Sequence, residues 1–189
     1  GHMQAVGYNL YCKMLNEAVL RLRGGKNVED DDFETVADIQ TDAFIPDSYI
    51  KNEALKLDIY RRIAAVENKE EQEDMLEELI DRFGDPPTAV MNLLEITLLR
   101  GLAHSLYITE VKARPDMITF TMYEKAKIRV DKIPELLEQM GGNMMFRHAE
   151  PAQFICRLQG GRRRFSGTIL EITREVLEEM CVLREEEEK

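Results

Sequence analysis

Cysteine is scarce in this sequence, and no motif brings the thiols together. The chain has three cysteines, Cys12, Cys156 and Cys181, and no two of them form a CxxC pair. Small secreted domains that rely on disulfides have a dense and even set of cysteines. The sparse, odd set therefore favours reduced thiols in a cytoplasmic protein.

Long hydrophobic runs and an excess of basic charge are also missing. No apolar segment approaches the roughly 20 residues that a membrane-spanning helix needs, so we expect no membrane partner. The 25 basic residues are outnumbered by 36 acidic ones, which gives a formal net charge of -11. Such a surface repels phosphate backbones and lipid headgroups, so a basic surface on another protein is the favoured partner.

Catalytic and cofactor-binding motifs are absent as well. The chain has no GxxxxGK[ST] phosphate loop and no serine or cysteine in a GxSxG elbow. His104 has no second ligand at helical spacing, and His148 facing Cys156 across a hairpin would supply only two ligands. The sequence therefore predicts a non-enzymatic chain without a cofactor or a metal.

Apolar periodicity predicts helices in the first half of the chain. Apolar residues recur at helical spacing in residues 7–23, 51–67, 69–83 and 87–107. An acidic loop and an extended segment that ends at Pro46 separate the first two helices. Asn68 and Glu71 have the spacing of a capping box, and Gly101 inside the fourth helix indicates close helix packing.

The second half changes to the alternating pattern of strands. Strands are predicted at residues 107–113, 117–123, 143–149 and 153–159, with a possible extension of the sheet at 127–132. A short helix is expected from Ile133 to Met140. A last helix, 167–184, follows Ser166 as its expected cap. The predicted fold class is α+β, with a helical N-terminal half, a small antiparallel sheet and a closing C-terminal helix.

The stretch MLEELIDRFGDPP, residues 75–87, ends a helix with two different faces. The core stripe is predicted to consist of Met75, Leu76, Leu79, Ile80 and Phe83. The other side is acidic, and Gly84 with the two prolines that follow ends the helix. This acidic face is a candidate interaction surface, although such a face is often only solvated.

Two classes of function remain open at this point. One is a regulatory or protein-interaction domain that uses the acidic helix face. The other is a nucleic-acid accessory domain that uses Arg162, Arg163 and Arg164. The negative net charge favours the first.

Four ordered motifs give the chain a resemblance to a known family. GYNLYCKMLNEAV, AFIPDSYI, RRIAAVENKEE and EELIDRFGDPP are similar to the C-terminal part of the bacterial transcription-repair coupling factors, the Mfd family. The resemblance covers nearly the whole chain. It implies that residues 4–45 are the end of a translocase core and that residues 46–189 are a C-terminal regulatory domain. Residues 1–3 look like a cloning scar.

The resemblance also implies a function and a location in the bacterial cytoplasm. Members of this family act on RNA polymerase stalled on damaged DNA, move by ATP-driven translocation and recruit UvrA. Their C-terminal domain has no ATPase; it clamps a UvrB-like N-terminal module of the same protein and competes with UvrA. The resemblance assigns this contact first to Glu78 and Asp81. The neighbouring Asp74, Glu77 and Arg82 are further candidates.

Overall fold

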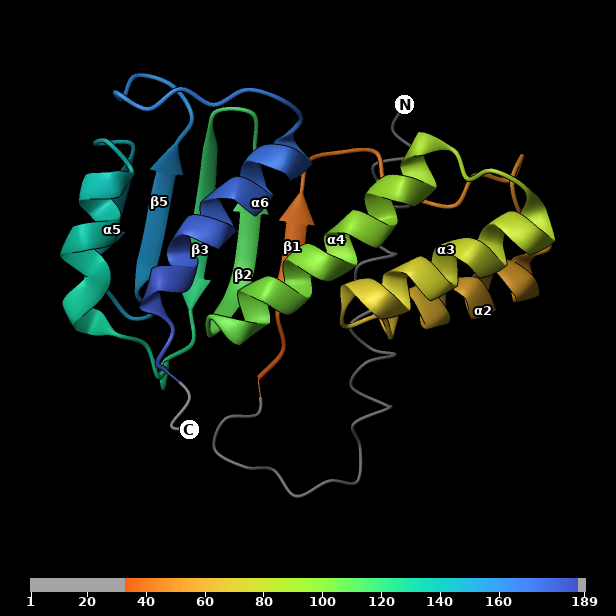
Figure 1. Cartoon of the computed structure of the whole chain (residues 1–189), viewed down its shortest axis with the longest axis horizontal. Helices are drawn as coiled ribbons and strands as arrows, with labels where there is room; N and C mark the ends of the chain where they lie inside the picture. Colours follow the sequence, from red (N-terminus) through yellow and green to blue (C-terminus); the bar gives the residue numbers. More distant parts are fainter. Residues whose placement is uncertain (1–32, 187–189) are drawn as a thin grey trace. The chain divides into compact units, whose positions relative to one another are not determined.

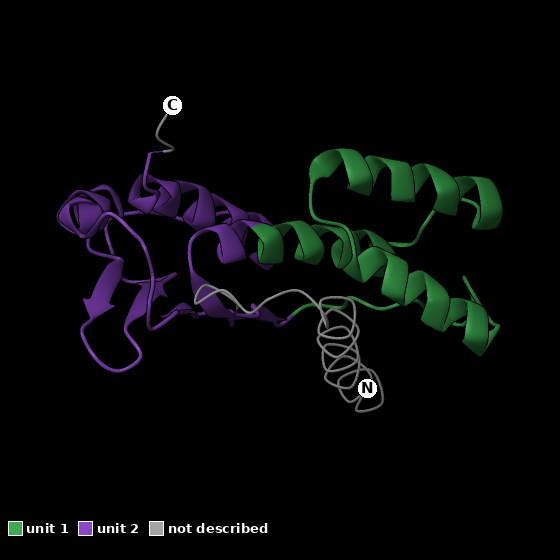
Figure 2. Ribbon diagram, turned by 90° about the horizontal axis from the view of Figure 1, so that it is seen from below, with its two compact units in different colours: residues 1–29, 41–101 green, residues 30–40, 102–189 purple. Residues whose placement is uncertain are grey.

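The computed structural model describes residues 33–186, so the helix predicted at residues 7–23 lies outside the described range. The chain divides into two compact units (Figure 2). Within the described range, unit 1 contains residues 41–101, and unit 2 contains residues 33–40 and 102–186.

Unit 1 is helical, as the sequence predicts. Its elements are α2 (Glu53–Ala64), α3 (Lys69–Phe83) and the greater part of α4 (Thr88–Ser105). Asparagine caps begin the first two helices: the side chain of Asn52 accepts a hydrogen bond from the Leu55 amide, and that of Asn68 accepts one from the Glu71 amide, both at 2.9 Å. These caps satisfy amides that would otherwise lack a partner in the first helical turn.

The core of unit 1 consists of aliphatic side chains from all of its helices, namely Ile59, Ile63, Leu79, Val90, Leu93, Leu94 and Leu99. Close helix packing at Gly101 is confirmed, because a Cβ at this position would lie 3.2 Å from the Glu67 carbonyl oxygen. The guanidinium of Arg100 donates to the Ala64 carbonyl at 2.7 Å, at the end of α2. Side chains and backbone thus both hold α4 against the α2–α3 connection.

Unit 2 contains a five-stranded sheet in the order β1-β2-β3-β5-β4 (Figure 1). Its strands are β1 (Val36–Ile39), β2 (Ile108–Ala113), β3 (Met117–Met122), β4 (Met144–Arg147) and β5 (Gln153–Arg157). The last four are antiparallel, but β1 runs parallel to β2. The fold class is therefore α+β as predicted, whereas the expectation of a purely antiparallel sheet was wrong.

The first strand comes from the segment that precedes the unit 1 helices. Ala37 and Ile39 are buried, while Val36 and Asp38 on the opposite face are half-buried. Asp38 forms an ion pair with Arg114 at 2.8 Å. A parallel pair needs a long connection between its strands, and here the whole of unit 1 supplies it. The domain boundary expected at residue 45 stays a prediction.

Helices α5 (Ile133–Gln139) and α6 (Ile169–Met180) complete unit 2, and α6 crosses one face of the sheet (Figure 1). The core of unit 2 consists of side chains from the buried face of the sheet and from α6. Its fully or almost fully buried members include Phe120, Phe154, Val176, Leu177 and Met180. None of the described helices is long and apolar enough to cross a bilayer.

Two local predictions in unit 2 were wrong. Residues 127–132 do not extend the sheet by a full strand: Ile128 forms a single bridge to Arg184, and Val130–Lys132 is a 3-10 turn. The cap of α6 is Thr168, which accepts a hydrogen bond from the Glu171 amide at 3.2 Å, and not Ser166. The helix starts later because Gly167, at φ +104°, adopts a conformation outside the helical region.

Candidate interaction surface on helix α3

The core stripe of α3 is narrower than the sequence predicts. Met75 and Leu79 are buried, Leu76 and Phe83 are half-buried, and Ile80 is 41% exposed. The assignment of Ile80 to the core was therefore wrong. Ile80 lies about 100° around the helix from Leu79, so it falls at the border of the acidic face.

The outer face of α3 carries acidic side chains that have no ionic partner among the described residues. Asp74, Glu77 and Asp81 are exposed, and none of them forms an ion pair or a side-chain hydrogen bond within residues 33–186. Their spacing of three and four residues places them on one line of the helix, opposite Leu79. Their charge is thus available to a partner.

Glu78 differs from these neighbours because α2 supplies a cation to it. Both guanidinium nitrogens of Arg62 contact the Glu78 carboxylate, with Nη2 to Oε1 at 2.7 Å. Nη1 of Arg82, one turn further along α3, lies 3.6 Å from Glu78 Oε2. The hydrogen bond with Arg62 lowers the pKa of Glu78 and raises that of Arg62. The structure thus brings Glu78 and Arg82 together, while Asp81 lies apart.

The C-terminal end of α3 is fixed by an aromatic contact. The Tyr49 hydroxyl donates to the Gly84 carbonyl at 2.7 Å, and its ring meets that of Phe83 edge-on at 5.8 Å. Gly84 has φ +84° and donates its amide to the Ile80 carbonyl at 3.0 Å, which ends the helix where the sequence predicts. The Arg82 guanidinium lies over the Phe83 ring, 5.0 Å from the ring centre.

The N-terminal end of α3 has a variant of the predicted capping box. Asn68 caps the Glu71 amide, as expected. The Glu71 carboxylate, however, accepts a hydrogen bond from the Glu67 amide at 2.9 Å, one residue before the cap. Both ends of α3 are therefore anchored by side chains, which keeps the acidic face in a fixed position.

A shallow groove of about 410 Å³ separates α2 from α3. Its lining is partly apolar and partly charged and consists of Arg62, Ala65, Val66, Glu71, Asp74, Met75 and Glu78. Sequence reasoning missed Arg62 as a member of this site. The available signal was its position in the last turn of the preceding helix, where basic residues are favoured.

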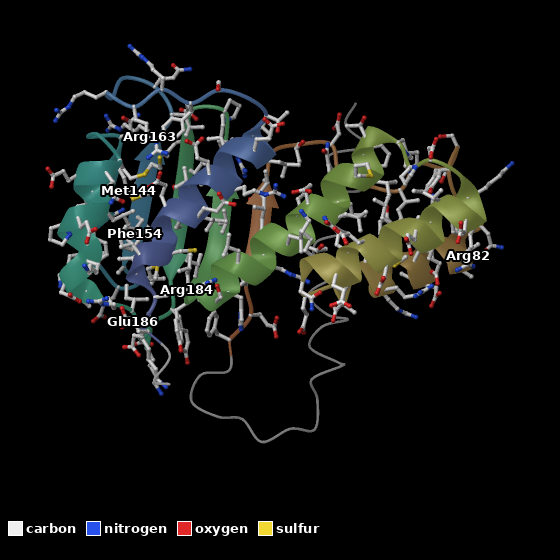
Figure 3. The ribbon with its side chains drawn as sticks, viewed as in Figure 1. Arg82, Met144, Phe154, Arg163, Arg184 and Glu186 are labelled. Carbon is white, nitrogen blue, oxygen red and sulfur yellow. The ribbon has the colours of Figure 1, made fainter. Side chains whose placement is uncertain are left out.

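The three arginines at residues 162–164, on which the alternative nucleic-acid function depends, differ in their contacts. Nη2 of Arg163 lies 2.8 Å from carboxylate oxygens of both Glu175 and Glu179 on α6 (Figure 3). Arg162 and Arg164 are exposed. The central arginine thus neutralises two acids of the same unit, which reduces the positive charge that this loop can offer to a phosphate backbone.

The histidines and cysteines of the described range are dispersed. Cys156 pairs with Met144 across the sheet, so the expectation that it faces His148 was wrong. Burial raises the pKa of the Cys156 thiol to about 11. His104 contacts the Thr35 hydroxyl at 3.1 Å and stacks on Phe33. No group of three potential metal ligands occurs in residues 33–186.

The chain has a mixed α+β fold, and comparison with known proteins identifies its family. The TRCF domain model matches residues 39–133, which include α2, α3 and α4. The chain belongs to the TRCF family.

Relatives and a solved structure agree with this assignment. The chain is 36% identical over 151 residues to the transcription-repair-coupling factor of Staphylococcus haemolyticus and 34% identical over 143 residues to that of Bacillus subtilis. These alignments cover 80% and 75% of this chain but only 12% of each relative. A crystal structure of the C-terminal domain of a transcription-repair coupling factor matches with a TM-score of 0.55 and 26% identity. That match covers 78% of this chain and 94% of the solved domain.

Proposed function

We propose that this chain is the C-terminal regulatory part of a transcription-repair coupling factor and acts as a clamp. It binds a UvrB-like module of the same parent protein and covers the surface to which UvrA would bind. Engagement of stalled RNA polymerase opens the clamp. The chain itself is non-enzymatic and takes no cofactor; ATP-driven movement on DNA belongs to other parts of the parent.

The observation that supports this proposal is the line of unpaired carboxylates on α3. An exposed helix with both ends anchored presents Asp74, Glu77 and Asp81, for which residues 33–186 supply no cation. A basic surface on the partner is attracted to such a line of carboxylates. Binding then costs little conformational entropy, because the helix is already rigid. Asp81 is the leading contact residue, and Glu78 and Arg82 lie at the edge of the same surface.

The weak interactions of this surface suit a clamp that has to open. Exposed ion pairs contribute about 0–1 kcal/mol each, so a few of them give a modest affinity. Inside one parent protein, a high effective concentration compensates for this modest affinity. A competing partner can then shift the equilibrium toward the open state, which a large hydrophobic interface would resist.

A titration tests the proposal. The 189-residue chain is mixed with the separately purified UvrB-like module of the same parent, and heat is measured over a series of salt concentrations. We expect binding that weakens as salt rises, because exposed charges are screened beyond about 10 Å at 0.1 M salt. Absence of binding at low salt, or binding that salt does not change, would contradict the proposal.

A further inference from the structure

The contact between Arg62 and Glu78 has a consequence for how the proposed clamp binds. Glu78 accepts from both terminal nitrogens of one guanidinium, and Arg82 adds a second cation at 3.6 Å. A carboxylate held in this two-pronged way has its most favourable acceptor positions occupied. Glu78, one of the two residues that the family resemblance marks first, is thus already bound within the chain.

The pair is nevertheless open to exchange. The side chains of Arg62 and Glu78 are 42% and 34% exposed, so a partner can reach both from solvent. The pair also lines the α2–α3 groove, together with Asp74. The same groove is lined by the buried Val66 and Met75 and the exposed Ala65, apolar side chains against which the methylene groups of a long basic side chain can pack.

We infer that Arg62 is an internal competitor for this site: a basic side chain of the partner binds in the α2–α3 groove by displacing Arg62 from Glu78. The inference rests on the proposed function. In the free chain the Arg62 guanidinium neutralises the Glu78 carboxylate. The apparent affinity for the partner is then reduced in proportion to the fraction of molecules in which Glu78 is released.

The contact between Arg62 and Glu78 thus limits the affinity of the proposed clamp for its partner. Removal of Arg62 frees the acceptor positions that its guanidinium occupies and leaves Arg82, at 3.6 Å, as the remaining cation beside Glu78. We expect Arg62→Gln to tighten binding of the UvrB-like module about two- to fivefold, the size that an exposed ion pair allows. If Arg62 instead positions Glu78 for the partner, the same variant weakens binding.

The chain offers a closely matched control. Arg61 lies in the same last turn of α2, is exposed and has no ion pair within the described residues. Arg61→Gln removes the same charge at the same helix end, so it reports the general electrostatic effect of one lost cation. We expect Arg61→Gln to change affinity less than Arg62→Gln.

The experiment is a cycle of calorimetric titrations with the UvrB-like module. The chains compared are the wild type, Arg62→Gln, Arg61→Gln, Glu78→Gln and the combination of Arg62→Gln with Glu78→Gln. Competition predicts that Arg62→Gln tightens binding in the wild-type background and has no effect beyond that of Arg61→Gln once Glu78 is replaced. Equal effects of the two arginine variants, or weaker binding by Arg62→Gln, would overturn the inference.

A second probe separates this inference from the proposed function. An arginine hexapeptide is titrated into the same chains, and the backbone signals of α3 are followed by NMR. Arg62→Gln should bind the peptide at α3 more tightly than Arg61→Gln, whether or not the UvrB-like module binds. Loss of module binding with this peptide result intact would refute the clamp alone, and equal peptide affinities would refute the competition.

Discussion

Helices α3 and α6 both carry acidic residues away from their cores, but the two helices treat this charge differently. On α6, Glu175 and Glu179 share the guanidinium of Arg163, whose side chain is 20% exposed. On α3, Glu78 alone has a cationic partner within the described part of the chain, and that partner, Arg62, is 42% exposed. Acidic residues on a helix are therefore not equivalent: Glu175 and Glu179 on α6 share a partly buried cation, whereas Asp74, Glu77 and Asp81 on α3 have no ion pair within residues 33–186.

The backbone contacts around Arg163 and Arg62 explain why their two ion pairs differ. The Arg163 amide donates to Asn143 at 3.0 Å, and Asn143, which is buried, donates in turn to the Arg157 and Arg163 carbonyls. A Cβ on Gly161 would lie 1.8 Å from the Asn143 side chain, so the loop packs tightly there. Arg62 stands on a regular helix without such additional contacts to its backbone. Its ion pair is thus free to exchange.

The largest expected effect tests whether α6 is part of the core of unit 2. Truncation after Gly160 removes the buried Leu170, Val176, Leu177 and Met180. Each buried apolar side chain contributes about 1.5–3 kcal/mol, and a domain has a net stability of only about 5–15 kcal/mol. We expect loss of cooperative thermal unfolding. Removal of residues 185–189 alone should leave the melting curve unchanged, and a normal melt after the long truncation would contradict this role of α6.

The next effect concerns Arg163. Arg163→Ala leaves Glu175 and Glu179 without their cation and should lower the free energy of unfolding by about 1–3 kcal/mol in urea denaturation. Arg162, its exposed neighbour, is the control, because surface substitutions usually change stability by less than about 0.5 kcal/mol. If both variants lose the same free energy of unfolding, Arg163 contributes no more to stability than its exposed neighbour Arg162.

A smaller effect is expected from Arg62. Arg62→Ala removes an exposed ion pair and should destabilise the chain by about 0–1 kcal/mol, with Arg61→Ala as the matched control. Urea denaturation at neutral pH measures both. A loss above about 2 kcal/mol would mean that the pair with Glu78 is a structural contact like that of Arg163, and the contrast between the two helices would disappear.

The smallest effect is the pH dependence of this pair. The pKa of Glu78 lies below its ordinary value of 4.5 because Arg62 favours the ionised form. A lowered pKa in the folded state contributes stability above the unfolded pKa and loses it as the pH falls through the folded pKa. The stability difference between the wild type and Arg62→Ala should therefore shrink as the pH falls below 4.5 and vanish once the pH is below the lowered folded-state pKa of Glu78. A difference that persists there would exclude the carboxylate as its source.

The sequence predicted the helices of residues 33–186, because local signals determine them, although α6 starts later than expected. Asn68 and Gly84 bound α3 at the expected residues. The place of β1 in the sheet could not be predicted, since its pairing with β2 joins residues that are more than 70 positions apart, as in Ile39 with Ala113. No local pattern encodes such a pairing.

The candidate site was predicted in part for the same reason. The acidic face of α3 is visible in the sequence because its members repeat at helical spacing. The pairing of Glu78 with Arg62 depends on how α2 and α3 pack against each other. The sequence pattern does not show this packing, so it did not distinguish Glu78 from its acidic neighbours on α3. Ile80 was misplaced because a five-residue apolar stripe is wider than the single line that α3 buries.

The role of the α3 face as a clamp is tested most directly by reversing its unpaired charges in the full-length parent protein. Glu77→Lys with Asp81→Lys leaves the Arg62–Glu78 pair and the buried Leu79 in place, so the fold should be retained. The control is Glu138→Lys with Glu178→Lys, two exposed glutamates of unit 2.

The measurement is the affinity of each full-length variant for UvrA, with thermal melts to verify folding. Like charges opposed across an interface cost several kcal/mol, so the α3 variant should favour the open state and bind UvrA at least about tenfold more tightly than the wild type. The control variant should bind like the wild type. If the folded α3 variant binds UvrA no better than the control, the acidic face of α3 is a solvated surface and not a clamp.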